Sequence, residues 1–299
     1  MLWHILIWYN KKTQLWCGTM KKQLLSNAVL KNIAYLTMLI DHFFAVIFTE
    51  IMWRHSMVGD DTSLMGQVYA TGRAVGRISF VLFAYLTVEG FMHTKSRLKY
   101  LLRLSMFALV SEVPFDLAFS GEVIDLSSQN IFFTLSISVL LLTVWEWAGG
   151  NIRRMCRRAR RDVYWYICVG VFRMVQFGAV LLGCGTAQFL RVDYKYMGVL
   201  LIFTFYILRN QSFLVKIVPA ACVMFLGTWS INIQRYAGDY TTAYLFRFSM
   251  RELYGLFAFI PITLYDGTKG RQLPKAVCYG FYPVHLLVLY GIARMILMR

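Results

Sequence analysis

LKNIAYLTMLIDHFFAVIF, residues 30–48, is an apolar stretch long enough to cross a bilayer as a helix, and it contains a carboxylate and an imidazole. Apolar runs of about 18 to 24 residues recur along the chain, separated by short polar stretches. A hydrocarbon core of about 30 Å imposes this spacing on helices, whereas a membrane β-barrel needs alternating segments of about ten residues, which are absent here. The sequence therefore predicts an all-α, polytopic integral membrane helix bundle.

The composition excludes an ordinary soluble domain. Of the 299 residues, 58% are hydrophobic and 15% charged, and the mean hydropathy is +0.54, against roughly 25% charged residues in soluble domains. The net charge of +16 would suggest nucleic acid as the partner of a soluble protein. Here the bases lie in particular loops between apolar runs, so we expect membrane lipid as a partner and no nucleic acid.

About nine transmembrane spans are predicted, of which the sixth, at about 13 residues, is short for a crossing. The predicted spans are residues 25–48, 75–92, 100–119, 131–147, 163–182, 196–208, 213–231, 248–265 and 277–298. No linker or internal repeat divides the chain. We expect residues 1–24 to form a cytoplasmic or interfacial segment, with initiation at Met20 as an alternative to Met1, and residues 25–299 to form one transmembrane domain.

The distribution of basic residues predicts the topology. The run NIRRMCRRARR, residues 151–161, lies between the fourth and fifth spans, whereas residues 120–128 contain Glu122 and Asp125 but no lysine or arginine. Because cytoplasmic loops carry an excess of lysine and arginine, the even-numbered loops and the N-terminus are predicted to be cytoplasmic and the C-terminus external.

Ionisable residues inside predicted spans are the main candidates for function, because each costs at least about 2.5 to 3.5 kcal/mol at mid-bilayer. Asp41 and His42 lie in the first span, and we expect a carboxylate such as Asp41 to orient the imidazole of His42. Both could instead be polar contacts between helices. Arg77 in the second span needs an anion, either a protein carboxylate or a ligand.

Two further spans contain candidates. Glu112 shares a helix face with Asp116 in the sequence SEVPFDLAF, and Pro114 between them is expected to kink the helix. The last span contains His285 close to Tyr282. There is no HExxH motif, no CxxC pair, no phosphate-binding glycine loop and no serine-nucleophile elbow, so no metal is expected. Acid/base chemistry by histidine and proton-coupled transport remain.

Five sequence blocks resemble the TraX family from about residue 30 to residue 291. They are LKNIAYLTMLIDHFFAVIF, the segment 76–119 with VEGFMHT and SEVPFDLAF, QNIFFTL at 129–135, DYKYMGVLLIFTFY at 193–206 and YGFYPVHLLVLYGI at 279–292. The family is named after a conjugative-plasmid protein associated with N-terminal acetylation of pilin, and it is grouped with transmembrane acyltransferases, including the acyltransferase-3 proteins. That class has a basic residue, usually arginine, eleven positions before a histidine. Lys31 and His42 have this offset here.

The resemblance implies a membrane-embedded acyltransferase of the bacterial inner membrane with acetyl-CoA as acyl donor. The acceptor would be an amine or hydroxyl of an exported peptide or envelope glycan. His42, Asp41, Arg77, Glu112 and His285 are the implied catalytic residues. Lys31, Arg77 and Tyr282 are the implied donor-binding residues.

His42 would act as a general base or become acylated itself, with Arg77 stabilising the oxyanion. A transporter or flippase and a non-catalytic scaffold are the alternatives. The sequence makes no prediction of oligomeric state.

Overall fold

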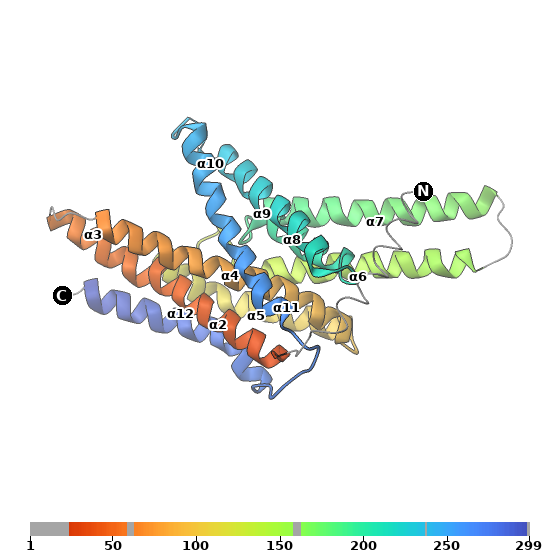
Figure 1. Ribbon diagram of the computed structural model, residues 1–299, viewed down its shortest axis with the longest axis horizontal. Coiled ribbons are helices and arrows are strands. Elements are labelled where there is room, and N and C mark those ends of the chain that lie inside the picture. The colour runs from red at the N-terminus through yellow and green to blue at the C-terminus, as the bar shows by residue number, and fades with distance from the viewer. Residues whose placement is uncertain (1–23, 59–62, 158–162, 237, 298–299) are drawn as a thin grey trace.

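The computed structural model describes residues 24–58, 63–157, 163–236 and 238–297. All the regular secondary structure in these ranges is helical (Figure 1). The predicted segment 1–24 therefore lies almost entirely outside the described residues. The described ranges contain no strand, only two isolated bridges that join neighbouring loops. The helices are α2 (Asn27–His42), η1 (Phe43–Phe48), α3 (Thr49–Val58), α4 (Ser63–His93), α5 (Arg97–Phe119), α6 (Ile131–Cys156), α7 (Val163–Phe189), α8 (Lys195–Ile207), α9 (Phe213–Tyr236), α10 (Thr242–Met250), η2 (Arg251–Ala258), α11 (Phe259–Thr263) and α12 (Lys275–Leu297).

The all-helical membrane fold is confirmed, but the count of nine spans is not. Six helical segments of the described residues are long and apolar enough to cross a membrane. They are Asn27–Ser56, Leu64–His93, Ile131–Cys156, Val163–Phe189, Phe213–Tyr236 and Lys275–Leu297. Three predicted spans are not among these six. The third corresponds to α5, the sixth to the short apolar helix α8, and the eighth is divided among α10, the 3₁₀ segment η2 and α11.

Local sequence explains where several helices begin. Ser96 accepts a hydrogen bond from the Lys99 amide at the start of α5, and Asn130 accepts one from the Phe132 amide at the start of α6. Such side chains satisfy backbone N–H groups that have no partner within the helix. Asn130 thus caps the helix that corresponds to the fourth predicted span. The side chain of Thr241 caps α10 in the same way.

The helix α4 is the central element of the bundle. It packs against α2, η2, α8 and α6 (Figure 1). Fully buried Val81, Leu82 and Ala84 lie near its middle. By contrast, α7 is mostly exposed along its length and packs mainly on α6 and α8, as expected of a helix that faces lipid. The charged side chains of Asp41, Arg77 and Glu252 lie where α4 meets α2 and η2.

Close contact between α2 and α4 depends on glycine. Gly76 of α4 touches the side chain of Asp41, and Gly72 touches the ring of Phe44, so a Cβ at either position would collide with α2. Directly after His42 the helix widens into the π-helical segment η1. Such widened turns are rare and often occur at functional sites. The packing thus brings the end of α2 close to the middle of α4.

The loop before α12 holds the start of α2. The amides of Asn27 and Ala28 donate to the carbonyls of Thr268 and Lys269, and the amide of Asp266 donates to the Leu25 carbonyl. These bonds satisfy the first amides of α2, which lack partners inside the helix. They also hold α12 beside α2. There the hydroxyl of Tyr35 donates to the backbone carbonyl of Cys278, although the two residues are 243 positions apart.

Candidate functional site

The two predicted intramembrane histidines meet. Nδ1 of His42, at the end of α2, lies 2.6 Å from Nε2 of His285 on α12, and the two rings are parallel within 1°. Phe281 stacks on His285 at 5.0 Å between ring centroids, and Phe119 packs edge-on against His42 at 5.5 Å. Both histidines are thus held by aromatic contacts from α5 and α12.

Hydrogen bonding assigns a tautomer to each neutral ring. Nδ1 of His285 lies 2.8 Å from the carbonyl oxygen of Phe281. Because a carbonyl oxygen only accepts, this nitrogen carries the proton, and Nε2 of a neutral His285 is an acceptor. Nδ1 of His42 then donates to it, which leaves Nε2 of His42 with a free lone pair. The pair therefore presents one basic nitrogen, on His42.

The expected role of Asp41 is corrected by its contacts. Its Oδ2 lies 2.9 Å from the Arg73 guanidinium and its Oδ1 3.7 Å from that of Arg77. His42 is instead positioned by His285. The physical reason is that adjacent helix positions point about 100° apart, so the side chains of Asp41 and His42 face α4 and α12 respectively.

Arg77 has its anions within the protein. Its guanidinium lies 3.2 Å from Glu252 of η2, and it donates to the hydroxyl of Tyr194 at 3.4 Å. With Asp41 it forms a largely buried charge network across α2, α4 and η2. The prediction that Arg77 requires an anion agrees with these pairs, and its expected function as an oxyanion donor stays a prediction.

The loop between α7 and α8 closes this network. The ring of Tyr194 stacks on Phe80 of α4 with 3.7 Å between centroids. Burial raises the pKa of the neighbouring Asp193 to about 6, against the opposing attraction of Arg77. The Asp193 backbone is fixed by bonds to Gln129 and Thr134, which tie this loop to the start of α6.

Glu112 lies on α5 and contacts the residue that caps α6. Its Oε2 accepts from both the backbone and the side-chain amide of Asn130. Its Oε1 is buried and has no hydrogen-bond partner among the described residues. The observed contacts of Glu112 are thus with the α6 cap, and its expected catalytic function stays a prediction.

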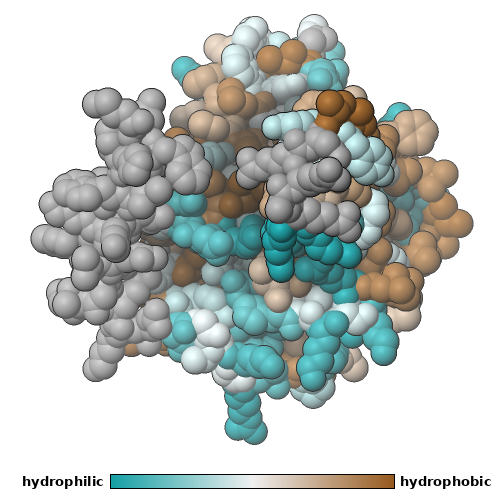
Figure 2. All heavy atoms as spheres, turned by 90° about the vertical axis from the view of Figure 1, so that its right-hand side faces the viewer, coloured by the Kyte–Doolittle hydropathy of each residue, from teal (hydrophilic) through white to brown (hydrophobic). Residues whose placement is uncertain are grey.

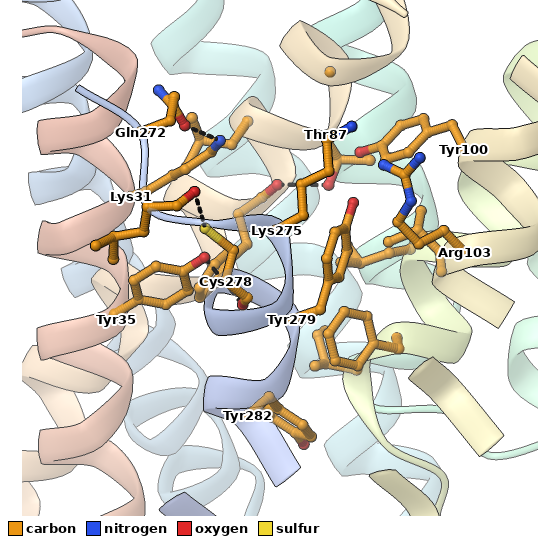
Figure 3. Close-up of a pocket in the computed structure, with 18 of the residues that line it drawn as sticks. Lys31, Tyr35, Thr87, Tyr100, Arg103, Gln272, Lys275, Cys278, Tyr279 and Tyr282 are labelled. Atoms are coloured by element: carbon orange, nitrogen blue, oxygen red, sulfur yellow. Dashed lines mark hydrogen bonds between the residues drawn. The ribbon is translucent and has the colours of Figure 1, made fainter. Parts of the chain in front are cut away.

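A cavity of about 370 Å³ lies between α2, α4, α5, α6 and α12 (Figure 3). This size is within the usual range for small-molecule sites. Aromatic and aliphatic side chains form most of its wall, with polar groups towards one end. The residues labelled in Figure 3 are Lys31, Tyr35, Thr87, Tyr100, Arg103, Gln272, Lys275, Cys278, Tyr279 and Tyr282.

Basic side chains surround the mouth of the cavity. Lys31 donates to Gln272 at 2.7 Å, and Arg103 and Lys275 also line this end (Figure 3). These residues lie near the helix ends predicted to face the cytoplasm. Figure 2 views the molecule from the right-hand side of Figure 1 and shows hydrophilic side chains across the centre and lower part of that face. Because three basic side chains line this end, the mouth of the cavity is suited to an anionic ligand.

Tyr282 connects the cavity to the histidines. It lines the cavity at the end opposite the bases, and it is 4% exposed. Its ring packs edge-on against both His42 and His285, with centroids 5.9 and 5.6 Å away. Of the predicted donor-binding residues, Lys31 and Tyr282 thus line the cavity at its two ends, whereas Arg77 belongs to the charge network.

Several residues of the site are not predicted from the sequence. Arg73, Arg103 and Lys275 lie near the ends of predicted spans, where basic residues are common, so no local pattern marks them as site residues. Glu252 is an acid within an apolar region, and the need of Arg77 for an anion is the signal that identifies it. Within the described ranges, no cluster of three or more His, Cys, Asp or Glu side chains could hold a metal ion.

Comparison with known proteins agrees with the sequence resemblance. A curated relative from Dichelobacter nodosus, called probable fimbrial assembly protein FimC, serogroup H1, is 28% identical over 122 residues, which are 38% of this chain and 44% of the relative. The chain thus matches less than half of that relative's length. No solved structure matches the chain. The model of the family described as TraX protein matches residues 26–293, and because this range covers most of the chain, the protein belongs to the TraX family.

Proposed function

We propose that this protein is a membrane-embedded acyltransferase that moves an acetyl group from cytoplasmic acetyl-CoA to an amine or hydroxyl of an exported acceptor. One observation supports this most: a cavity with bases at its mouth reaches Tyr282, which touches both members of the His42–His285 pair. The cavity would hold the donor, and the histidine pair would supply the base.

The dimensions of the site agree with coenzyme A. Lys31 and His42 are eleven residues apart on one helical rod, which is about 16 Å at 1.5 Å per residue. The extended pantetheine arm of coenzyme A has a comparable length, so phosphates beside Lys31 and Lys275 would place the thioester near the histidines. The offset of Lys31 and His42 is also the basis of the proposed relationship to acyltransferase-3 proteins.

His42 would act as the general base. Its free Nε2 lone pair would take the proton of the acceptor amine or hydroxyl as the acceptor attacks the thioester carbonyl carbon. His285 would hold the ring through the 2.6 Å contact and stabilise the proton on Nδ1 of His42. In the alternative reaction, Nε2 of His42 attacks the thioester itself and passes the acetyl group on.

The proposed location is the bacterial inner membrane with the N-terminus in the cytoplasm. The basic mouth of the cavity favours a cytoplasmic donor, since positive loops stay on that side. The relative named as a fimbrial assembly protein favours an acceptor among exported peptides, such as the N-terminus of a pilin-like subunit. An envelope glycan is the second acceptor class in the proposal.

The test uses membranes from cells that produce the full chain. Radiolabelled acetyl-CoA is added, and label in envelope peptide and glycan is counted for the wild type, His42→Ala and the control His55→Ala, whose histidine lies on α3 outside the cavity. We expect label with the wild type and control and none above background with His42→Ala. Equal labelling by all three, or none with the wild type, would refute the proposal.

A further inference from the structure

Tyr282 has the position of a catalytic residue that stabilises negative charge. We propose that its hydroxyl donates the hydrogen bond to the thioester oxygen when that oxygen becomes an oxyanion. This inference rests on the proposed acetyl transfer and assigns one of its steps to a residue. It replaces the donor that the sequence suggested, Arg77.

Arg77 is engaged elsewhere. Its guanidinium pairs with Glu252 at 3.2 Å and lies 3.7 Å from Asp41, and its Nε donates to the Arg73 carbonyl at 3.3 Å. Releasing it would leave the carboxylate of Glu252 unpaired in a low-dielectric region, which is costly. An oxyanion donor must be available without such rearrangement.

The hydroxyl of Tyr282 is available. A tyrosine hydroxyl has one proton to donate and lone pairs to accept with. The backbone N–H of Ile131, at the start of α6, lies near the hydroxyl oxygen of Tyr282. Among the described residues no group accepts the hydroxyl proton. The proton is therefore free to bond to a ligand in the cavity that Tyr282 lines.

Two further features bear on this position. The start of α6 lies against Tyr282, and the partial positive charge of this helix N-terminus offsets the carboxylate of Glu112, which bonds to the α6 cap. The ring of Tyr282 also contacts the base, His42, so the acceptor proton and the thioester oxygen would be handled side by side. Tyr282 is only 4% exposed, so little water reaches its hydroxyl, and the low dielectric strengthens the hydrogen bond that the hydroxyl would donate.

The reaction step balances as follows. The acceptor lone pair forms a bond to the thioester carbon, the π electrons of the C=O bond move to oxygen, and Tyr282 donates to that oxygen. His42 takes the acceptor proton at Nε2. The C=O bond re-forms as the C–S bond breaks, the sulfur of coenzyme A leaves with the electron pair, and the proton passes from His42 to sulfur.

The test compares Tyr282→Phe with the wild type and with Tyr290→Phe, which removes a hydroxyl from the same helix outside the cavity. Label transfer from acetyl-CoA is measured in membranes at several donor concentrations. Removing one oxyanion donor lowers kcat by roughly 100- to 1,000-fold in other enzymes. We expect a loss of that order for Tyr282→Phe with KM for acetyl-CoA within about twofold, and no loss for Tyr290→Phe.

A purely structural function of Tyr282 gives another pattern. Tyr282→Phe would then lower the melting temperature and raise KM, with kcat changed little. Because the Ile131 amide loses its partner in this variant, a second one replaces Tyr282 by 4-fluorophenylalanine, which keeps the shape and donates no proton. Wild-type kcat in either folded variant would overturn the inference. Absence of transfer by the wild type would instead refute the proposed function.

Discussion

His42 and His285 are 243 positions apart in the sequence, and their facing ring nitrogens lie 2.6 Å from each other. The contact depends on the loop before α12, which bonds to the first amides of α2. It also depends on the Phe281 carbonyl, which fixes the proton on His285. The pair therefore has one nitrogen that can accept a proton, Nε2 of His42. It lies beyond the end of the cavity that is opposite Lys31, Arg103 and Lys275.

The histidine pair is expected to act as a unit. Replacing His285 by Ala removes the acceptor that orients His42, so kcat should fall by about 10- to 100-fold. Replacing His42 by Ala should cost about 100- to 10,000-fold. Label transfer in membranes measures both. The double variant should be no slower than His42→Ala, because the two residues serve one proton transfer. If instead the loss in kcat of the double variant equals the product of the two single losses, the histidines act independently.

Arg77 is expected to matter for stability more than for turnover. Arg77→Gln leaves Glu252 without its arginine, whereas Asp41 keeps Arg73, and breaking a buried pair costs about 3–5 kcal/mol. The melting temperature of the purified protein in detergent should therefore fall strongly. Adding Glu252→Gln should recover part of the loss. The control is Arg173→Gln on the exposed helix α7. Equal melting temperatures of Arg77→Gln and Arg173→Gln would contradict the described charge network.

The bases at the cavity mouth are expected to set the affinity for the donor. Lys31→Met and Lys275→Met should each raise KM for acetyl-CoA by about fivefold, since one charge at a partly exposed site contributes about 1 kcal/mol. The kcat should stay unchanged. Lys99→Met, at the same end of the molecule but outside the cavity lining, is the control. A KM that responds equally to all three changes would argue against a specific phosphate site.

Gly76 is expected to be intolerant of a side chain. A Cβ there would collide with Asp41, and overpacking of this kind costs about 1–3 kcal/mol. Gly66→Ala on the same helix meets open space, so it should be neutral or slightly stabilising, because alanine favours helix by about 0.5–1 kcal/mol. Thermal unfolding of both variants checks this. Equal stability would mean that α2 and α4 are not in close contact.

The sequence predicts the helical membrane fold and identifies His42 and His285 as unusual residues within apolar spans. The recurrence of apolar runs and the cost of burying His42 and His285 are both local properties of the chain, so they can be recognised without a structure. The count of nine crossings is not confirmed. The helix α5, with five charged residues, is not among the six candidates, α8 is short, and the segment of α10, η2 and α11 changes its helical form.

The pairing of charges could not be derived from the sequence. Asp41 is next to His42, which suggested that it orients the ring, but the helix turns its carboxylate towards Arg73 of α4. Glu252 meets Arg77 across 175 residues, and no local pattern encodes such a contact. The aromatic contacts of Tyr282 likewise arise from the packing of α12 on α2 and α6.

The central claim is that His42 serves acetyl transfer from coenzyme A to an exported acceptor. Its most direct test is mass spectrometry of envelope peptides and glycans from cells that produce the wild type, His42→Ala or no chain at all. The account predicts a mass increase of one acetyl group on a defined acceptor with the wild type and its absence in the other two. Identical acetylation in all three strains would contradict it.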